Sequence, residues 1–148
     1  MRQKYKLGDI VKIGLGQGRI TYGQLLKDAS IRIFNIVSQS EVELIELENT
    51  EIIFHSGVFH TSIANGEWPV VGNIPLKGEE DSWAPPEYIQ DIVDPEKFRI
   101  YHKGKMTSAT KEQVAGLEKQ VMRKPGELIN VLNELLKKST NKRLWFKR

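Results

Sequence analysis

Hydrophobic and polar residues alternate over much of the first 60 positions, and this period of two predicts β-strands. Two such runs, residues 9–13 and 19–26, flank a glycine-rich turn, so we expect a β-hairpin. Residues 31–37 place Ile31, Ile33 and Val37 on one face, with Asn35 as an exception, and Phe34 and Ile36 on the other, which is typical of an inner strand buried on both sides. A further strand is predicted over residues 52–59, with a β-bulge at Gly57.

The middle of the chain lacks a sustained period. Residues 41–48 fit neither the helical nor the strand period, and we interpret them as a short helix or turn. Residues 61–86 are dense in Gly and Pro, which predicts irregular loops with short regular pieces. Two more short strands are predicted over residues 88–93 and 98–101, separated by a turn at Asp94-Pro95.

The C-terminal part has a helical pattern. Thr110 to Gln113 fits a capping box, with Val114, Leu117 and Val121 on one stripe of the predicted helix. Pro125 suits the first turn of a second helix. The apolar residues of that helix recur at i, i+1, i+4, i+7 and i+8, and they are Leu128, Ile129, Leu132, Leu135 and Leu136.

These elements predict a mainly β (α+β) fold, a strongly bent antiparallel sheet or partial barrel with one or two C-terminal helices packed against it. The length of 148 residues suits one domain, which we place at residues 1–138, with a basic tail over residues 139–148. No apolar run approaches the roughly 20 residues that span a bilayer, and no signal peptide is recognisable. The lack of cysteine excludes disulfides and thiolate chemistry and fits a cytoplasmic protein.

The net charge of +3 hides a marked segregation of charge along the chain. Residues 1–32 carry a formal charge of +5, residues 33–96 carry −12 and residues 97–148 carry +10. Such asymmetry is informative about binding partners more than about the fold. The alternative is that segments of opposite charge fold together and neutralise one another. The charge pattern therefore predicts a protein that docks a partner through a charged surface.

The sequence contains no combination of residues that is typical of a catalytic site. The glycines at 14, 16 and 18 have the wrong spacing for a dinucleotide loop, and no serine lies in a Gly-x-Ser-x-Gly elbow. His55 and His60 lie five residues apart, on opposite faces of a regular strand, and only a bulge would bring them together as metal ligands. We therefore expect no enzyme activity, no cofactor and no metal.

A small nucleic-acid-binding barrel is the alternative function. The basic ends of the chain could meet phosphates, and Tyr22 and Trp68 could stack on bases. The acidic middle segment would repel a polyanion unless it faced away. For Trp68 and Trp83, burial beneath the long loops is the other interpretation, and we favour it.

Several segments in order resemble immunity protein family 26 of bacterial polymorphic toxin systems, over roughly residues 4–103. They are residues 4–13, 18–23, 62–76, 85–91 and 98–101. The resemblance implies a mostly β protein that binds a toxin domain, nuclease-type among others, and neutralises it in the producing bacterium. It transfers no site residue by residue.

Charge alone supplies the predicted interface. An acidic surface can occupy the basic groove of a nuclease, and complementary charge speeds association. The expected partner is a cognate toxin domain, with no direct nucleic acid and no membrane, and the oligomeric state stays open. The predicted contact residues are the acids of two segments and one aromatic side chain, namely Glu41, Glu43, Glu46, Glu48, Glu79, Glu80, Asp81 and Trp83.

Overall fold

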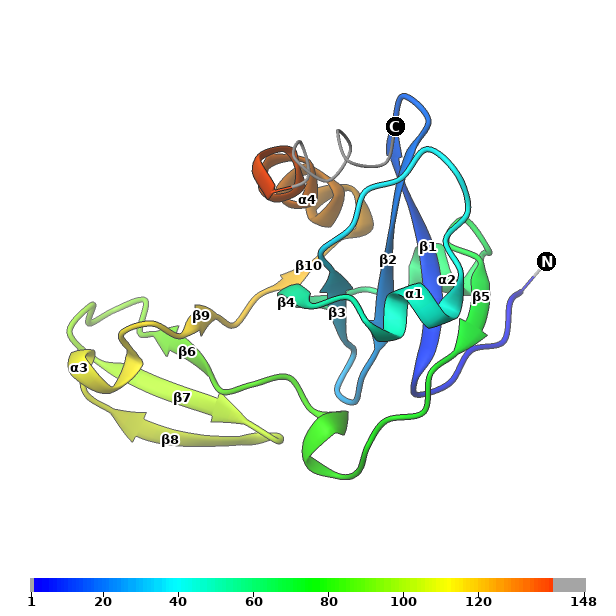
Figure 1. The fold of residues 1–148 in the computed structure, drawn as a ribbon. Coiled ribbons are helices and arrows are strands. Elements are labelled where there is room, and N and C mark those ends of the chain that lie inside the picture. The colour runs from blue at the N-terminus through cyan, green and yellow to red at the C-terminus, as the bar shows by residue number, and fades with distance from the viewer. Residues whose placement is uncertain (1, 140–148) are drawn as a thin grey trace.

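The computed structural model describes residues 2–139 and places them in two β-sheets flanked by short helices (Figure 1). Sheet A has the strand order β10-β4-β3-β2-β1-β5, and sheet B has the order β8-β7-β6-β9. The strands of sheet A are β1 (Asp9–Gly16), β2 (Arg19–Leu25), β3 (Ser30–Phe34), β4 (Ile52–Val58), β5 (Val70–Asn73) and β10 (Met122–Arg123). The strands of sheet B are β6 (Glu87–Gln90), β7 (Phe98–His102), β8 (Lys105–Ala109) and β9 (Glu118–Lys119).

Four α-helices and one 3-10 turn complete the chain: α1 (Leu44–Glu48), α2 (Thr61–Ala64), α3 (Lys111–Val114), α4 (Pro125–Ser139) and η1 (Glu80–Ser82). The prediction of a mainly β, α+β fold with a C-terminal helix is confirmed, and neither sheet of the described residues closes into a barrel. Of the predicted basic tail, all but Ser139 lies outside the described residues.

The predicted hairpin is present as β1 and β2. Gly16 pairs with Arg19, and both turn residues between them have positive φ, 57° at Gln17 and 75° at Gly18. This is the type I′ turn that matches the twist of two paired strands, and it explains why a glycine is needed there. The predicted inner strand is also confirmed, because β3 lies between β2 and β4.

The bulge predicted at Gly57 is in the wrong place. The register between β3 and β4 shifts where Ile33 and Phe34 face Phe54 and Ile52, whereas Gly57 pairs regularly with Ser30. Gly57 is needed for a different reason, since β10 pairs with β4 beside it: a Cβ there would lie 2.4 Å from the sulfur of Met122. The glycine allows close approach of a neighbouring strand.

The capping box at Thr110 is confirmed, with Gln113 N donating to Thr110 Oγ1 at 3.1 Å. The longer helix predicted to follow it is wrong, because α3 ends at Val114 and Gly116 adopts a φ of +84°. The chain then runs through β9 and β10 instead, so Leu117 and Val121 share no helical stripe.

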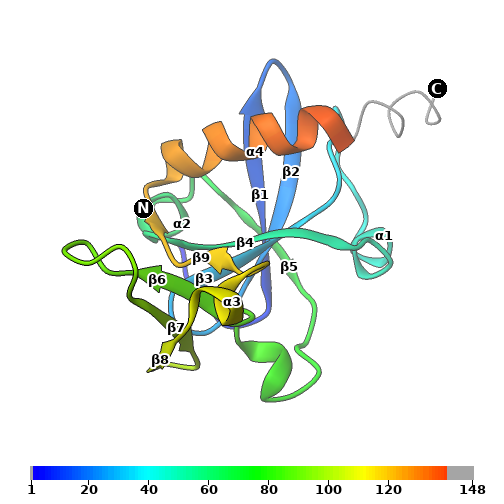
Figure 2. The same ribbon diagram turned by 90° about the vertical axis from the view of Figure 1, so that its left-hand side faces the viewer.

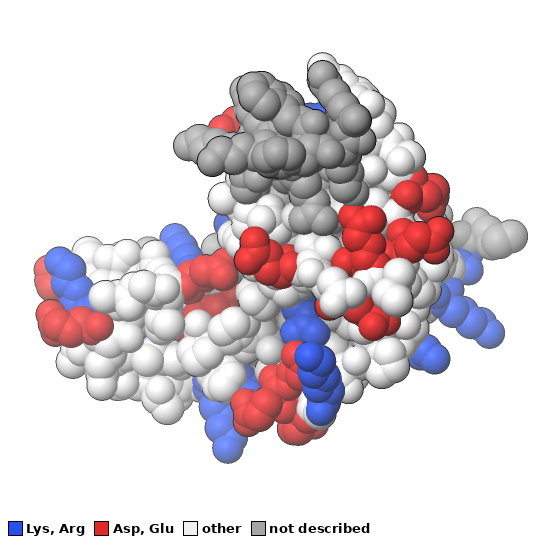
Figure 3. Space-filling model, viewed as in Figure 1, with Lys and Arg blue, Asp and Glu red and all other residues white. Residues whose placement is uncertain are grey.

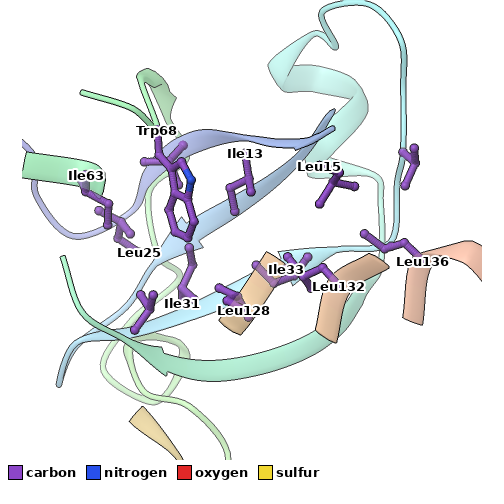
Figure 4. Packing of buried hydrophobic residues seen from close by; sticks show 13 residues of the cluster. Ile13, Leu15, Leu25, Ile31, Ile33, Ile63, Trp68, Leu128, Leu132 and Leu136 are labelled. Carbon is purple, nitrogen blue, oxygen red and sulfur yellow. The ribbon is translucent and has the colours of Figure 1, made fainter. Parts of the chain in front are cut away.

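Helix α4 begins at Pro125 as predicted and covers one face of sheet A (Figure 1). Its side chains Leu128, Leu132 and Leu136 are fully buried and point at the strands, with Ile13 and Ile33 among their neighbours in the cluster (Figure 4). Trp68 joins the same cluster at 3% exposure, which confirms the interpretation of this residue as core.

Burial on the other face of sheet A is carried by the segment between β3 and β4. Leu47 of α1 is fully buried against Ile10, Tyr22, Phe34 and Ile36. Sheet A is therefore packed on both faces, with α4 on one and the α1 segment on the other.

Sheet B projects from this body as an arm (Figures 1 and 2). Among the described residues 87–119, Val114 is the single buried hydrophobic side chain. The arm is joined to the body by the strand segment 118–123, which pairs with β6 in one sheet and with β4 in the other. Hydrogen bonds from Tyr101 to Asp28 and from Lys103 to Glu80 connect the two parts as well.

Within the described residues, none of the helices combines the length and the apolar character that crossing a bilayer requires.

Candidate protein-binding surface

Helix α1 carries the first predicted acidic segment, and packing determines which of its side chains face outward. Leu47 is buried beneath the helix, and the backbone N–H of Val42 donates to the Tyr22 hydroxyl at 3.0 Å. Gly72 on β5 makes room for the helix, because a Cβ there would lie 2.5 Å from Leu44 Cδ1. With these apolar residues held inward, the polar side of α1 faces solvent.

Acidic side chains gather over α1 (Figure 3). Glu43 and Glu48 are exposed, and neither has an ion pair or side-chain hydrogen bond within the described part of the chain. Glu46 is half-buried. Glu41 contacts Lys12 with an N–O distance of 2.6 Å, and its hydrogen bond raises the pKa of Lys12. The surface around α1 therefore keeps a negative charge that nearby bases neutralise only in part.

An apolar side chain stands among these acids. Ile45 is 70% exposed on α1, next to Leu44, which packs inward. Ile45 and Glu48 lie three residues apart on α1, and a helix presents such residues on the same side, so Ile45 projects beside Glu48. An exposed aliphatic side chain with an acidic surround is typical of a protein interface, in which an apolar centre lies inside a polar rim. The sequence pattern does not single out Ile45, because residues 41–48 show no clear period.

The second predicted acidic segment, residues 79–81, is neutralised by bases. Glu79 binds Lys27 at 2.9 Å, Glu80 binds Lys103, and Asp81 takes both terminal nitrogens of Arg32 at 2.8 and 3.3 Å. The hydrogen bond from Lys27 lowers the pKa of Glu79, and the hydrogen bonds from Arg32 lower the pKa of Asp81. Each acid of this segment therefore already has a basic partner.

Trp83 belongs to the same paired cluster. Its indole Nε1 donates to Glu79 at 3.1 Å, and the ammonium of Lys27 lies 5.3 Å from its ring centroid. The side chain is partly buried. Trp83 thus contacts both members of the Lys27–Glu79 ion pair. Only part of its ring is accessible to a binding partner.

One residue of each acidic segment, Glu48 and Asp81, lines a common groove with a volume of about 480 Å³. Arg32 also lines the groove, and its Nε donates to the buried Gln24 at 2.8 Å. The structure therefore brings part of each predicted segment to a common site. The remaining lining residues are Phe34, Asn49, Thr50, Ile52, Ile74, Pro75 and Lys77.

A buried acid lies elsewhere, where sheets A and B meet. Glu87 is 6% exposed, and burial raises its pKa to about 7, with the nearby carboxylates Glu118 and Asp28 adding to the shift. His55 lies 3.7 Å from Glu118, whereas His60 contacts Tyr5, so the two histidines do not converge on one site. Among the described residues, no group of three or more His, Asp or Glu has the geometry to hold a metal.

A protein-family model described as Immunity protein 26 matches residues 6–99, which is 94 of the 148 residues. The matched segment includes α1, the groove and the 79–81 segment. No curated protein and no solved structure matches the chain.

Proposed function

This chain belongs to the immunity protein 26 family, and we propose that it binds a cognate toxin of a polymorphic toxin system and neutralises it in the cytoplasm of the bacterium that makes both. The function is stoichiometric inhibition, with no chemistry on a substrate. The protein therefore needs a surface that recognises one partner quickly and tightly.

The observation that carries the proposed site is the acidic surface around α1, which nearby bases neutralise only in part. Glu43 and Glu48 are exposed and lack ion pairs in the described part of the chain, and Ile45 of the same segment is 70% exposed. A nuclease holds phosphates in a basic groove, so a surface of carboxylates is complementary to it. Such complementarity can raise association rates to about 10⁸–10⁹ M⁻¹s⁻¹ at low salt, which matters because free toxin harms its producer.

The groove beside α1 gives this surface a place for a side chain of the toxin. Its lining combines the apolar Phe34, Ile52 and Ile74 with the paired Arg32. Buried anchors in such pockets dominate the energy of many interfaces, whereas the rim charges act on association and specificity. We propose that Glu41, Glu43, Glu46 and Glu48 form the rim on one side and that the paired residues Glu79, Glu80, Asp81 and Trp83 form the opposite wall.

Co-expression with the toxin domain encoded beside this gene tests the function. Cells that express the toxin domain alone should stop growing, and cells that also express this chain should grow and yield a co-purifying complex. Growth arrest in the presence of this chain, without a complex, would contradict the proposal.

A second experiment separates immunity from the alternative of direct nucleic-acid binding. At physiological salt the purified protein should not be retained on a column of DNA or RNA, because its net charge is only +3 and its α1 surface is acidic. Retention that falls steeply with salt would instead favour nucleic-acid binding.

A further inference from the structure

The outermost strand of sheet B has an open edge. Strand β8 pairs with β7 over all five of its residues without a register shift, from Phe98–Ala109 to His102–Lys105. Both views of the fold place β8 at the rim of the arm, with no element beyond it (Figures 1 and 2). In the described part of the chain, residues 105–109 form no hydrogen bond outside the β7–β8 pair.

The turn between β7 and β8 determines which backbone groups face outward. Lys103 and Gly104 have φ values of 54° and 78°, so the hairpin has a two-residue turn and His102 and Lys105 form its closing hydrogen-bonded pair. Hydrogen-bonded and non-hydrogen-bonded pairs alternate along an antiparallel ladder. Met106 and Ser108 therefore direct their N–H and C=O groups away from β7, at the open edge.

Proteins usually protect such an edge with proline, a bulge, or a charge in the middle of the strand. Strand β8 has none of these, and its one charged residue, Lys105, is at the end. The outer strand of sheet A differs, because the N–H of Val70 on β5 donates to the side chain of Gln3 at 2.9 Å. The edge of β8 is thus both regular and unguarded.

We propose that β8 pairs antiparallel with β8 of a second copy of this chain, about a two-fold axis at Thr107. In this register Met106 faces Ser108 of the second copy, so the four outward backbone groups of each strand find partners. No like charges stand opposite each other, since Lys105 faces Ala109. The edge is self-complementary, as a symmetric dimer interface requires, and Thr107 forms a close cross-strand pair with its equivalent.

This pairing also explains the exposure of Met106 and the small core of the arm. Met106 is 57% exposed on the free strand, and Val114 is the one buried hydrophobic side chain of described residues 87–119. Small sheets gain stability from added strands. The contact is short, well below the roughly 1,200 Å² of a standard interface, so the dimer forms at high micromolar concentration or above.

The register makes Thr107 the position to test. Sedimentation velocity should show wild-type protein passing from monomer to dimer as its concentration rises to about 1 mM. Thr107→Lys and Thr107→Glu should each remain monomeric, because each places like charges directly opposite one another. An equimolar mixture of the two variants should dimerise again, more tightly than wild type. Gln39→Lys and Gln39→Glu, at an exposed site of the body, are the matched controls and should dimerise as wild type does.

Several results would overturn the proposal. They are a wild-type protein that stays monomeric over the whole range, a dimer that Thr107→Lys leaves intact, and a mixture of variants that shows no rescue. The wild-type protein could also fail to dimerise while Thr107→Lys loses toxin binding. That result would mean that the β8 edge pairs with a strand of the toxin, and it would likewise overturn the proposed dimer. Circular dichroism of each variant verifies the fold.

Discussion

The acidic segments 41–48 and 79–81 look alike in the sequence but have different environments in the structure. The first lies around α1, where Glu43 and Glu48 are exposed without an ion pair in the described part of the chain. The second has a base for each acid, supplied by Lys27, Arg32 and Lys103. The acids of the second segment connect parts of the fold, whereas Glu43 and Glu48 of the first remain available to a partner.

The difference shows that a count of charges overstates the surface that a partner can use. Paired acids produce a field that falls off quickly with distance, because each is cancelled by a neighbouring base. Unpaired acids act over a longer range and can steer a basic partner. We therefore propose a docking surface centred on α1, next to the groove that Glu48 and the ion-paired Asp81 both line.

The largest effect is expected for an acid in a third environment. Glu87 is buried with a folded-state pKa of about 7 against 4.5 in the unfolded chain. Between these values the folded state keeps a proton that the unfolded state has released, so stability falls as pH rises through this window. Glu87→Gln removes the penalty and should stabilise the protein above pH 7 by up to about 3 kcal/mol.

Urea unfolding at several pH values measures this effect. Wild type and Glu87→Gln should have similar stability below pH 4.5, where both states of Glu87 hold the proton, and should diverge as pH rises toward 7. A constant difference between the two proteins at all pH values would contradict the buried, protonated state of Glu87.

Removal of a paired acid has the next largest effect. Asp81→Asn leaves Arg32, which is 17% exposed, without its carboxylate partner. Loss of one member of a fully buried pair costs about 3–5 kcal/mol, and for this half-buried pair we expect about 2 kcal/mol. Glu43→Gln is the matched control and should change stability by less than about 0.5 kcal/mol. Equal losses in urea unfolding would remove the distinction between the two segments.

The smallest of these effects concerns the apolar centre of the α1 surface. Ile45→Ser should weaken toxin binding about tenfold, mainly through faster dissociation, because apolar burial holds the complex once it has formed. Ile92→Ser is the control, since Ile92 is 98% exposed at the far end of sheet B. Surface plasmon resonance measures both, and equal affinities would place the contact elsewhere.

Local patterns account for the parts of the fold that could be predicted. The β1–β2 hairpin, the capping box at Thr110 and the start of α4 at Pro125 each depend on a few neighbouring residues. Strands β9 and β10 have two residues each and exist only because they pair with β6 and β4. A strand of two residues is too short to show a period of two in the sequence. The helical spacing of Val114, Leu117 and Val121 was therefore the one pattern visible there, and it predicted a helix.

The site was predictable in its charge but not in its pairing. Lys27, Arg32 and Lys103 lie 52, 49 and 23 residues from the acids that they bind. Only the folded structure brings residues so far apart in the sequence into contact. Ile45 was missed for a related reason, since a five-residue helix is too short to show which of its apolar residues faces inward.

The rate of association with the toxin domain tests the central claim most directly. Glu43→Lys combined with Glu48→Lys changes the charge of the α1 surface, and Glu96→Lys combined with Glu112→Lys makes the same change on exposed residues of the arm. Stopped-flow measurements at low salt should show association slowed about tenfold to a hundredfold by the first pair, with a much smaller salt dependence, and little changed by the second. Equal association rates and equal salt dependence for the two double variants would contradict a docking surface centred on α1.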